Sequence, residues 1–152
     1  ICKILKSKGY FVGINLMQIT EQSEDKIINA SKKIKDAKPD VLYFADSLGA
    51  MGTSEVSKYV RNLRTHWKGE LGIHTHNNLG KAISNSIAAI ESGVTWIDST
   101  VTGMGRGPGN SETEYLLIEM AKFSKQKFNL LPITKRATTK ICPNVPHART
   151  LQ

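Results

Sequence analysis

Two patterns of hydrophobic and polar positions alternate along the first 120 residues. Short runs rich in β-branched and aromatic residues predict strands at 10–16, 41–45, 71–76 and 94–100. Between these runs, apolar residues recur every three or four positions and predict amphipathic helices at 23–38, 53–67, 79–91 and 111–120. The chain therefore repeats a unit made of a strand, a loop and a helix.

Polar residues and glycine mark the ends of the predicted helices. Ser23 and Thr53 are expected to cap the first two helices, because a hydroxyl oxygen can accept a free backbone N–H there. Ser111 and Glu114 have the spacing of a capping box and are expected to open the fourth helix. Gly93 is expected to end the third helix.

The order of the elements predicts an α/β fold with a parallel sheet. The run 41–45 is apolar throughout, which is typical of a strand that is covered on both faces. Right-handed crossovers leave two architectures, a doubly wound sheet or part of a (β/α)8 barrel. A complete barrel takes about 250 residues, so this chain of 152 residues corresponds to about half of one. Residues 1–9 are expected to be the end of a helix.

The periodic pattern weakens near residue 127, and the charge balance changes there too. Residues 1–121 hold 14 Lys and Arg against 13 Asp and Glu, whereas residues 122–152 hold seven Lys and Arg and no acid. The net charge of +8 therefore comes from the C-terminal segment and does not indicate a nucleic-acid-binding fold. We expect an α/β domain at 1–127 and a basic, irregular tail at 128–152, in which 128–133 could begin another element.

Cysteine usage and hydropathy narrow the cellular context. Cys2 and Cys142 lack the C-x-x-C spacing of a redox or zinc motif, and the chain shows no signal-peptide pattern. No apolar run approaches the roughly 20 residues that cross a bilayer. These features predict a reduced, cytoplasmic protein with neither a membrane nor a nucleic-acid partner.

His74 and His76 are the strongest candidates for chemistry. They lie two residues apart on a predicted strand, so both imidazoles point to the same side. Two neutral imidazoles at this spacing can chelate one divalent cation, at the strand end where α/β proteins bind ligands. The alternative is that both rings are hydrogen-bonded wall residues or face solvent.

A glycine-rich loop at 103–109 follows the last predicted strand. Its glycines allow positive φ and a close approach of the backbone to a ligand. Arg106 in this loop could bind a carboxylate or a phosphate, and an exposed loop arginine is the alternative. Asp98, at the end of the preceding strand, is expected to accept hydrogen bonds from loop N–H groups.

Two segments together resemble a known family. They are G-I-H-T-H-N-N-L-G at 72–80 and W-I-D-S-T-V-T-G-M-G-R-G-P-G-N at 96–110. At their mutual spacing they resemble the C-terminal half of the DRE-TIM metallolyase barrels. Within that family, the residues of the two motifs are most similar to the 4-hydroxy-2-oxovalerate aldolase branch. The resemblance covers about residues 10–120. It implies a partial TIM (β/α)8 barrel of about four βα units, barrel strands four to seven.

The resemblance also implies site residues. His74 and His76, at the end of barrel strand six, are expected to ligate Mn2+, Mg2+ or Zn2+, and Asn110 is expected to complete or support this metal site. Asn110 could instead serve only as a helix-start residue. Asp46 and Ser47, with Arg106, are expected to contact the substrate, and the alternative for Asp46 and Ser47 is that they fix the following loop. The catalytic base is not assigned.

The implied reaction is carbon–carbon lysis of the 4-hydroxy-2-oxo-acid aldolase type. A small-molecule 2-oxo acid such as pyruvate is the expected partner, since its carboxylate and keto oxygen can chelate a divalent cation that keeps open positions. Acyl transfer of the 2-isopropylmalate or homocitrate synthase type is one alternative. A catalytically silent half-barrel or assembly subunit is another. The loop cysteine of the 3-hydroxy-3-methylglutaryl-CoA lyases is absent from 101–110.

One departure from the family pattern affects these expectations. The Asp-Arg-Glu-type motif of barrel strand one, whose aspartate is the anionic metal ligand, does not occur in the 152 residues. We therefore expect a fragment that lacks this aspartate, or a half-barrel. Because a half-barrel exposes strand edges, we expect a homo-oligomer or pairing with a chain that completes the barrel.

Overall fold

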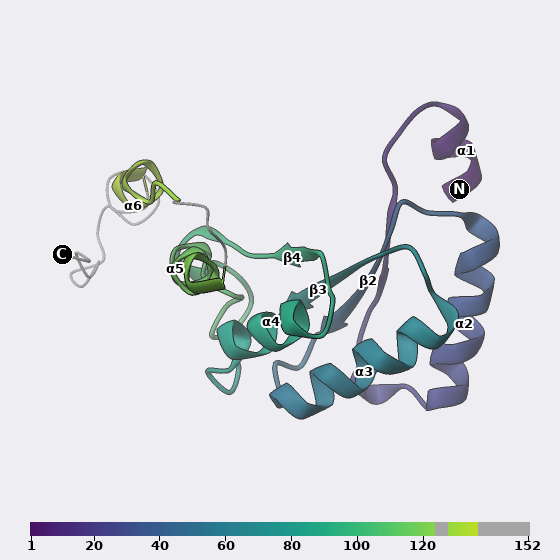
Figure 1. The fold of residues 1–152 in the computed structure, drawn as a ribbon, viewed down its shortest axis with the longest axis horizontal. Helices are drawn as coiled ribbons and strands as arrows, with labels where there is room; N and C mark the ends of the chain where they lie inside the picture. Colours follow the sequence, from purple (N-terminus) through teal and green to yellow (C-terminus); the bar gives the residue numbers. More distant parts are fainter. Residues whose placement is uncertain (124–127, 137–152) are drawn as a thin grey trace.

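A computed structural model describes residues 1–123 and 128–136 and shows a parallel sheet at the centre of the molecule (Figure 1). The strand order follows the chain order, and every neighbouring pair of strands is parallel. The strands are β1 (Gly13–Leu16), β2 (Val41–Asp46), β3 (Glu70–Thr75) and β4 (Trp96–Asp98). The α/β fold with a parallel sheet that the pattern predicts is confirmed.

Helices connect the strands and cover one face of the sheet. The connecting helices are α2 (Glu24–Ala37), α3 (Thr53–His66) and α4 (Ala82–Glu91). The remaining elements are α1 (Cys2–Ser7), α5 (Thr113–Phe123), α6 (Leu131–Arg136) and the 3-10 helices η1 (Ile19–Glu21) and η2 (Val101–Gly103). In Figure 1, α2, α3 and α4 lie along one side of the strands, and α1 and α5 stand at opposite ends of the sheet.

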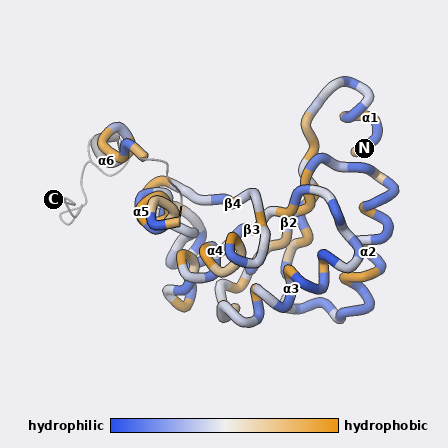
Figure 2. Tube along the Cα trace, viewed as in Figure 1, coloured by the Kyte–Doolittle hydropathy of each residue, from blue (hydrophilic) through white to orange (hydrophobic). Residues whose placement is uncertain are grey.

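The hydrophobic core lies between this face and the helices. Phe44 and Ile73 on neighbouring strands are fully buried and belong to the same cluster as Val56 and Val60 of α3. Each such side chain contributes about 1.5–3 kcal/mol when it is removed from water. Figure 2 shows hydrophobic residues along β2 and β3 and hydrophilic residues on the solvent side of α2 and α3. Burial of this face therefore fixes the register of the sheet.

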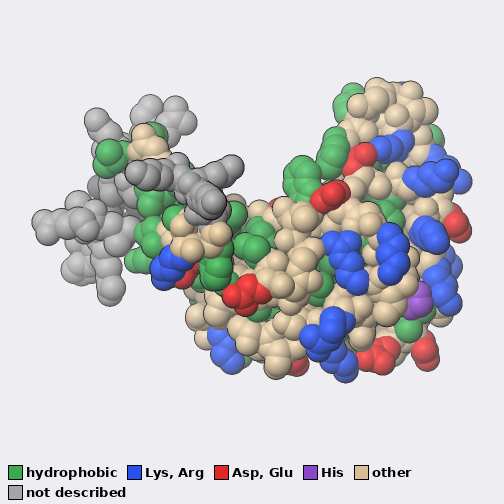
Figure 3. Space-filling model, viewed as in Figure 1, with side chains coloured by type: hydrophobic (Ala, Val, Ile, Leu, Met, Phe, Trp, Pro, Cys, Tyr) green, Lys and Arg blue, Asp and Glu red, His purple; other side chains and the backbone are tan. Residues whose placement is uncertain are grey.

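The other face of the sheet is open in the described part of the chain. Tyr43, Gly72 and Trp96 form one row across β2, β3 and β4 on this face. Trp96 is 41% exposed and its ring lies 5.2 Å from that of Phe11, which is 61% exposed. Figure 3 shows hydrophobic side chains along the hollow between the lobe with α1 and the lobe with α5. A doubly wound sheet carries helices on both faces, so this one-sided arrangement corresponds to a segment of a barrel.

Two predicted helix caps are wrong. Gly52, not Thr53, is the N-cap of α3, and its N–H donates to the carboxylate of Glu55 at 2.8 Å. Ser111 and Glu114 do not form a capping box, because Glu114 instead accepts the N–H of Thr102 with both carboxylate oxygens, each at 3.1 Å. Local spacing predicted both caps. A hydrogen bond within the same turn, between Gly52 and Glu55, replaces the first, and a contact with Thr102, twelve residues earlier in the chain, replaces the second.

Ser23 occupies the predicted N-cap position of α2 without a side-chain hydrogen bond to the helix. Two strands are shorter than predicted, since β1 begins at Gly13 rather than at residue 10 and β4 covers only Trp96–Asp98. Both are the outer strands of the described sheet, where backbone pairing is available on one side only. Residues beyond that pairing leave the extended ladder whatever their β propensity.

A short helix, α6, lies at the start of the segment that was expected to be irregular. Asn129 begins it by accepting the N–H of Leu131 at 3.2 Å. Pro132 fits its first turn because the N–H that proline lacks has no partner within a helix there. The rest of the expected tail, residues 137–152 with Cys142 and His147, lies outside the described residues.

Candidate functional site

The two histidines lie side by side at the carboxyl end of β3. His74 is the penultimate residue of the strand, and His76 follows it directly. Their ring centroids are 5.0 Å apart with the planes at 80°. Both rings therefore reach the open side of the sheet, as the two-residue spacing predicts.

Asn110 faces this pair from the glycine-rich loop. Its backbone forms an isolated antiparallel bridge with His76, which places the two side chains next to each other. The amide Nδ2 donates to the carbonyl oxygen of Met104 at 3.2 Å, and this bond fixes Oδ1 as the remaining acceptor. Oδ1 of Asn110 and Nδ1 of His76 are buried and have no hydrogen-bond partner.

Gly105 makes room for the Asn110 amide. A Cβ at residue 105 would lie between 2.6 and 3.0 Å from the three terminal atoms of that amide, which is closer than real contacts allow. A close approach of backbone to side chain therefore requires glycine here. The loop thus presents Asn110 in one orientation.

The side chains of His74, His76 and Asn110 are chemically suited to bind a divalent metal ion, although none of the three carries a negative charge. Imidazole nitrogens and an amide oxygen are ordinary ligands, and two unpartnered buried acceptors are costly unless something binds them. In the part of the chain that the structure describes, no three His, Cys, Asp or Glu side chains gather closely enough to hold a metal.

Asp98 and Tyr43 extend the site along the open face, a connection that no local sequence pattern predicts. Oδ2 of Asp98 lies 3.3 Å from Nδ1 of His74. Burial, the negative charge of Asp98 and a hydrogen bond to it raise the pKa of Tyr43 to about 12. The expectation that Asp98 binds loop N–H groups is wrong, because its contacts are with these two side chains. Strand register, which spacing within one segment does not show, brings the three together.

The environment of His76 favours its neutral form. Burial and the positive charges of His74 and Arg106 lower the pKa of His76, and the opposing effect of the Asp46 carboxylate is smaller. A neutral imidazole is the form that binds a metal.

The predicted substrate residues organise the loops around the histidines. The carboxylate of Asp46 is fully buried and accepts the N–H groups of Ala50 at 3.1 Å and Met51 at 3.2 Å. Ser47 accepts the N–H of Gln18 through Oγ at 2.9 Å. These contacts correspond to the loop-fixing alternative, and contact with a substrate stays a prediction for both residues.

Arg106 joins two loops at the same edge of the sheet. Its Nη2 donates to the carbonyl oxygen of Ser47 at 3.1 Å, although Arg106 is an exposed residue. The loops after β2, β3 and β4 therefore meet around the histidines, at the edge where parallel α/β sheets bind ligands.

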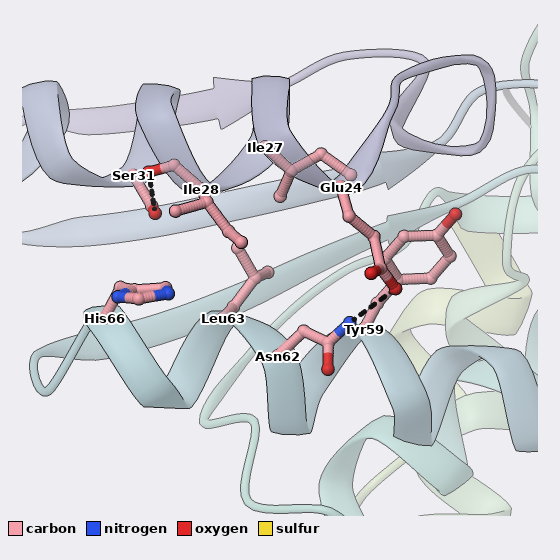
Figure 4. Close-up of a pocket in the computed structure, with 8 residues that line it drawn as sticks. All are labelled: Glu24, Ile27, Ile28, Ser31, Tyr59, Asn62, Leu63 and His66. Carbon is pink, nitrogen blue, oxygen red and sulfur yellow. Dashed lines mark hydrogen bonds between the residues drawn. The ribbon is translucent and has the colours of Figure 1, made fainter.

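A groove between α2 and α3 lies on the helix-covered side of the sheet. Figure 4 shows His66 and Leu63 of α3 facing Ile28 and Ser31 of α2. The groove is bordered by a hydrogen bond of 3.3 Å from Asn62 to Glu24. His66 lines this groove, so it is separated by the sheet from the pair His74 and His76.

Comparison with known proteins points to one family. A family model described as HMGL-like matches residues 1–140. A 4-hydroxy-2-oxovalerate aldolase from Carboxydothermus hydrogenoformans is 38% identical over 120 residues, which are 79% of this chain and 36% of the relative. The enzyme of the same name from Bacillus thuringiensis is 34% identical over 138 residues, 90% of this chain and 40% of the relative. The chain therefore spans about two fifths of the length of these relatives.

Solved structures show the same fold. The N-terminal domain of a putative aldolase from Bacteroides vulgatus superposes with a TM-score of 0.84 at 30% identity, over 93% of this chain and 48% of that one. The HMG-CoA lyase of Bacillus subtilis superposes with a TM-score of 0.81 over 94% of this chain and 54% of that one. Its identity of 20% supports the fold alone. In the described residues, no helix is both long and apolar enough to span a membrane.

Proposed function

The chain belongs to the HMGL-like family, the DRE-TIM metallolyases, and we propose that it carries part of the site of a divalent-metal-dependent aldolase. The proposed reaction is cleavage of a 4-hydroxy-2-oxo acid to pyruvate and an aldehyde, or its reverse. The observation that supports it best is the placement of His74 and His76 beside Asn110 at the strand ends. Relatives that bear the aldolase name are 34–38% identical to this chain.

Three side chains would hold the cation in this proposal. His74 and His76 offer ring nitrogens, and Asn110 offers the buried, unpartnered Oδ1. A divalent cation bound there supplies Lewis-acid polarisation of a carbonyl oxygen. Mn2+, Mg2+ and Zn2+ all remain candidates, because a mixed nitrogen and oxygen donor set suits each of them.

The loops would position a 2-oxo acid next to these ligands. Arg106 is anchored at the Ser47 carbonyl, near enough for its charge to act on His76, and its guanidinium can bind a carboxylate. Asp46 and Ser47 keep the loop after β2 in place, so that the Arg106 anchor at the Ser47 carbonyl stays fixed. A small-molecule substrate would then be oriented by the Arg106 guanidinium on one side and by the cation on the other.

Hydrogen exchange at the methyl group of pyruvate tests the proposal. With the full chain and Mg2+ in deuterated water, proton NMR should show loss of the methyl signal, because enolisation is part of the aldolase reaction. His74→Ala and His76→Ala should each lower the exchange rate at least about 100-fold. His66→Ala is the matched control, since His66 lies on the other side of the sheet, and it should retain the exchange.

Three results would contradict the proposal. One is exchange that persists in His74→Ala at the wild-type rate. Another is thiol release from acetyl-CoA in the presence of a 2-oxo acid without any pyruvate exchange, which would favour the acyl-transfer alternative. The third is absence of both activities in a chain that binds metal, which would favour the silent half-barrel.

A further inference from the structure

Asp98 contacts His74 from the neighbouring strand. β3 and β4 place the two residues opposite each other in the register, and Oδ2 of Asp98 lies 3.3 Å from Nδ1 of His74. The His74 side chain is 23% exposed and the Asp98 side chain 45% exposed. In the described part of the chain, His74, His76 and Asp98 do not form a group that could hold a metal ion. The contact that the structure shows for Asp98 on this side is thus with the imidazole of His74.

Tyr43 contacts Asp98 from a third strand. Its ring lies against Gly72 of β3, where an added Cβ would come within 2.5–2.6 Å of three ring atoms. Because Gly72 has no side chain, the Tyr43 ring can lie over the backbone of β3 at this position. From there the Tyr43 hydroxyl is close enough to the Asp98 carboxylate for its negative charge to raise the pKa of Tyr43. Tyr43, Asp98 and His74 are consequently neighbours on the open face, with His74 opposite Asp98 in one row and Tyr43 in the adjacent row with Gly72 and Trp96.

A carboxylate beside one imidazole nitrogen selects the tautomer of the ring. The negative charge favours a proton on Nδ1, which can then donate to the carboxylate. Nε2 is left with its lone pair, and it is the nitrogen on the far side of the ring from Asp98. Carboxylate partners of this kind orient metal-binding histidines and raise their basicity.

We propose that Asp98 is a positioning residue that holds the Nδ1–H tautomer of His74, and that Tyr43 keeps Asp98 in place. The role of the tautomer in binding a cation rests on the function proposed above. The tautomer itself does not, because it is a property of the metal-free chain. The first measurement can therefore be made without metal, substrate or activity.

Nitrogen NMR of the imidazoles tests the tautomer directly. In the metal-free full chain, at a pH about one unit above the ordinary histidine pKa, His74 should show a protonated Nδ1 and an unprotonated Nε2. In Asp98→Asn the carboxylate charge is lost with little change of shape, and the Nε2–H form should appear. Tyr43→Phe should give a smaller shift in the same direction. Asp36→Asn removes the charge of an exposed residue of α2 and should leave the tautomer of His74 unchanged.

Mn2+ titration followed by electron paramagnetic resonance provides the second measurement. Asp98→Asn should weaken binding about 10- to 100-fold, the usual effect of losing such a partner. Asp98→Glu should recover part of the affinity, and Asp36→Asn should bind as the wild type does. Thermal unfolding of each variant establishes that the chain remains folded.

The two measurements separate the two proposals. If His74 has the same tautomer in the wild type and in Asp98→Asn, the positioning role is overturned, whatever the metal affinity. If the tautomer of His74 changes in Asp98→Asn but neither the wild type nor any variant binds Mn2+, the positioning role stands and the metal-dependent function is overturned. A tautomer change together with weakened Mn2+ binding supports both.

Discussion

At the scale of single residues, the absence of a side chain decides where two functional groups lie. Gly72 leaves space for the Tyr43 ring and Gly105 leaves space for the Asn110 amide. Neither residue needs positive φ, so the reason for glycine at both positions is contact rather than backbone conformation. A methyl group at either position would move a neighbour that the candidate site uses.

Gly105→Ala tests this reading at the metal site. The added methyl group would push the Asn110 amide away from the Met104 carbonyl and move Oδ1 relative to His76. Mn2+ binding, measured by electron paramagnetic resonance, should weaken by about tenfold or more.

The control for this variant is Gly52→Ala. A Cβ at residue 52 would meet only the Glu55 carboxylate, at an ordinary 3.7 Å, and φ there is negative. Wild-type Mn2+ affinity in Gly105→Ala, with the fold intact, would show that Asn110 does not contribute a ligand.

At the scale of elements, Asp40 connects α1 to the start of the sheet. Its carboxylate accepts the N–H of Val12 at 2.7 Å and forms an ion pair with Lys6 of α1. The backbone N–H of Asp40 donates back to the carbonyl oxygen of Val12 at 2.8 Å. The Lys6 and Val12 hydrogen bonds to the carboxylate lower the pKa of Asp40 below its ordinary 3.8.

This lowered pKa predicts how stability depends on pH. A carboxyl group with a lower pKa in the folded state binds fewer protons than in the unfolded state, so it stabilises the fold above its ordinary pKa. That contribution is lost as the pH falls below about 4 and through the folded-state pKa. Urea unfolding should therefore show that Asp40→Asn is less stable than wild type at about pH 6 and that the difference shrinks towards about pH 3.

Asp36→Asn serves as the control for this experiment. Asp36 is an exposed residue near the end of α2 and carries the same charge. Its variant should follow the wild-type pH profile in parallel. A difference between Asp40→Asn and wild type that stays constant from about pH 6 to about pH 3 would refute the linkage.

At the scale of the whole molecule, the described sheet has one buried and one open face. The buried face packs against α2, α3 and α4, whereas the open face carries the histidines and the Phe11 and Trp96 pair. Aromatic side chains that are 61% and 41% exposed favour association with another apolar surface. We therefore expect a further apolar surface to cover both of them.

Replacement of this aromatic pair tests the association. Phe11→Ser with Trp96→Ser should raise the dissociation constant of any assembly of the full chain by about tenfold or more, because apolar area is removed from the interface. Sedimentation velocity over a range of concentrations measures this. Leu79→Ser, which changes an apolar side chain that is 57% exposed and lies outside the pair, is the control. Equal sedimentation of wild type and double variant would exclude the open face as an interface.

The sequence by itself determined what depends on local spacing. Apolar runs and helical periodicities gave the order of strands and helices, since burial on one face requires those periods. The spacing of His74 and His76 placed both rings on one side of a strand for the same reason. The resemblance of two motifs indicated the family, which the comparisons confirm.

Only the tertiary structure decided what depends on register between segments. Asp98 lies opposite His74 because β4 pairs with β3 at that register, and Tyr43 reaches Asp98 because Gly72 lies between them. Glu114 binds Thr102 rather than the residue that a capping box would supply. Each of these contacts joins residues 12 or more apart in the chain, and local periodicity carries no information about which distant partner a side chain meets.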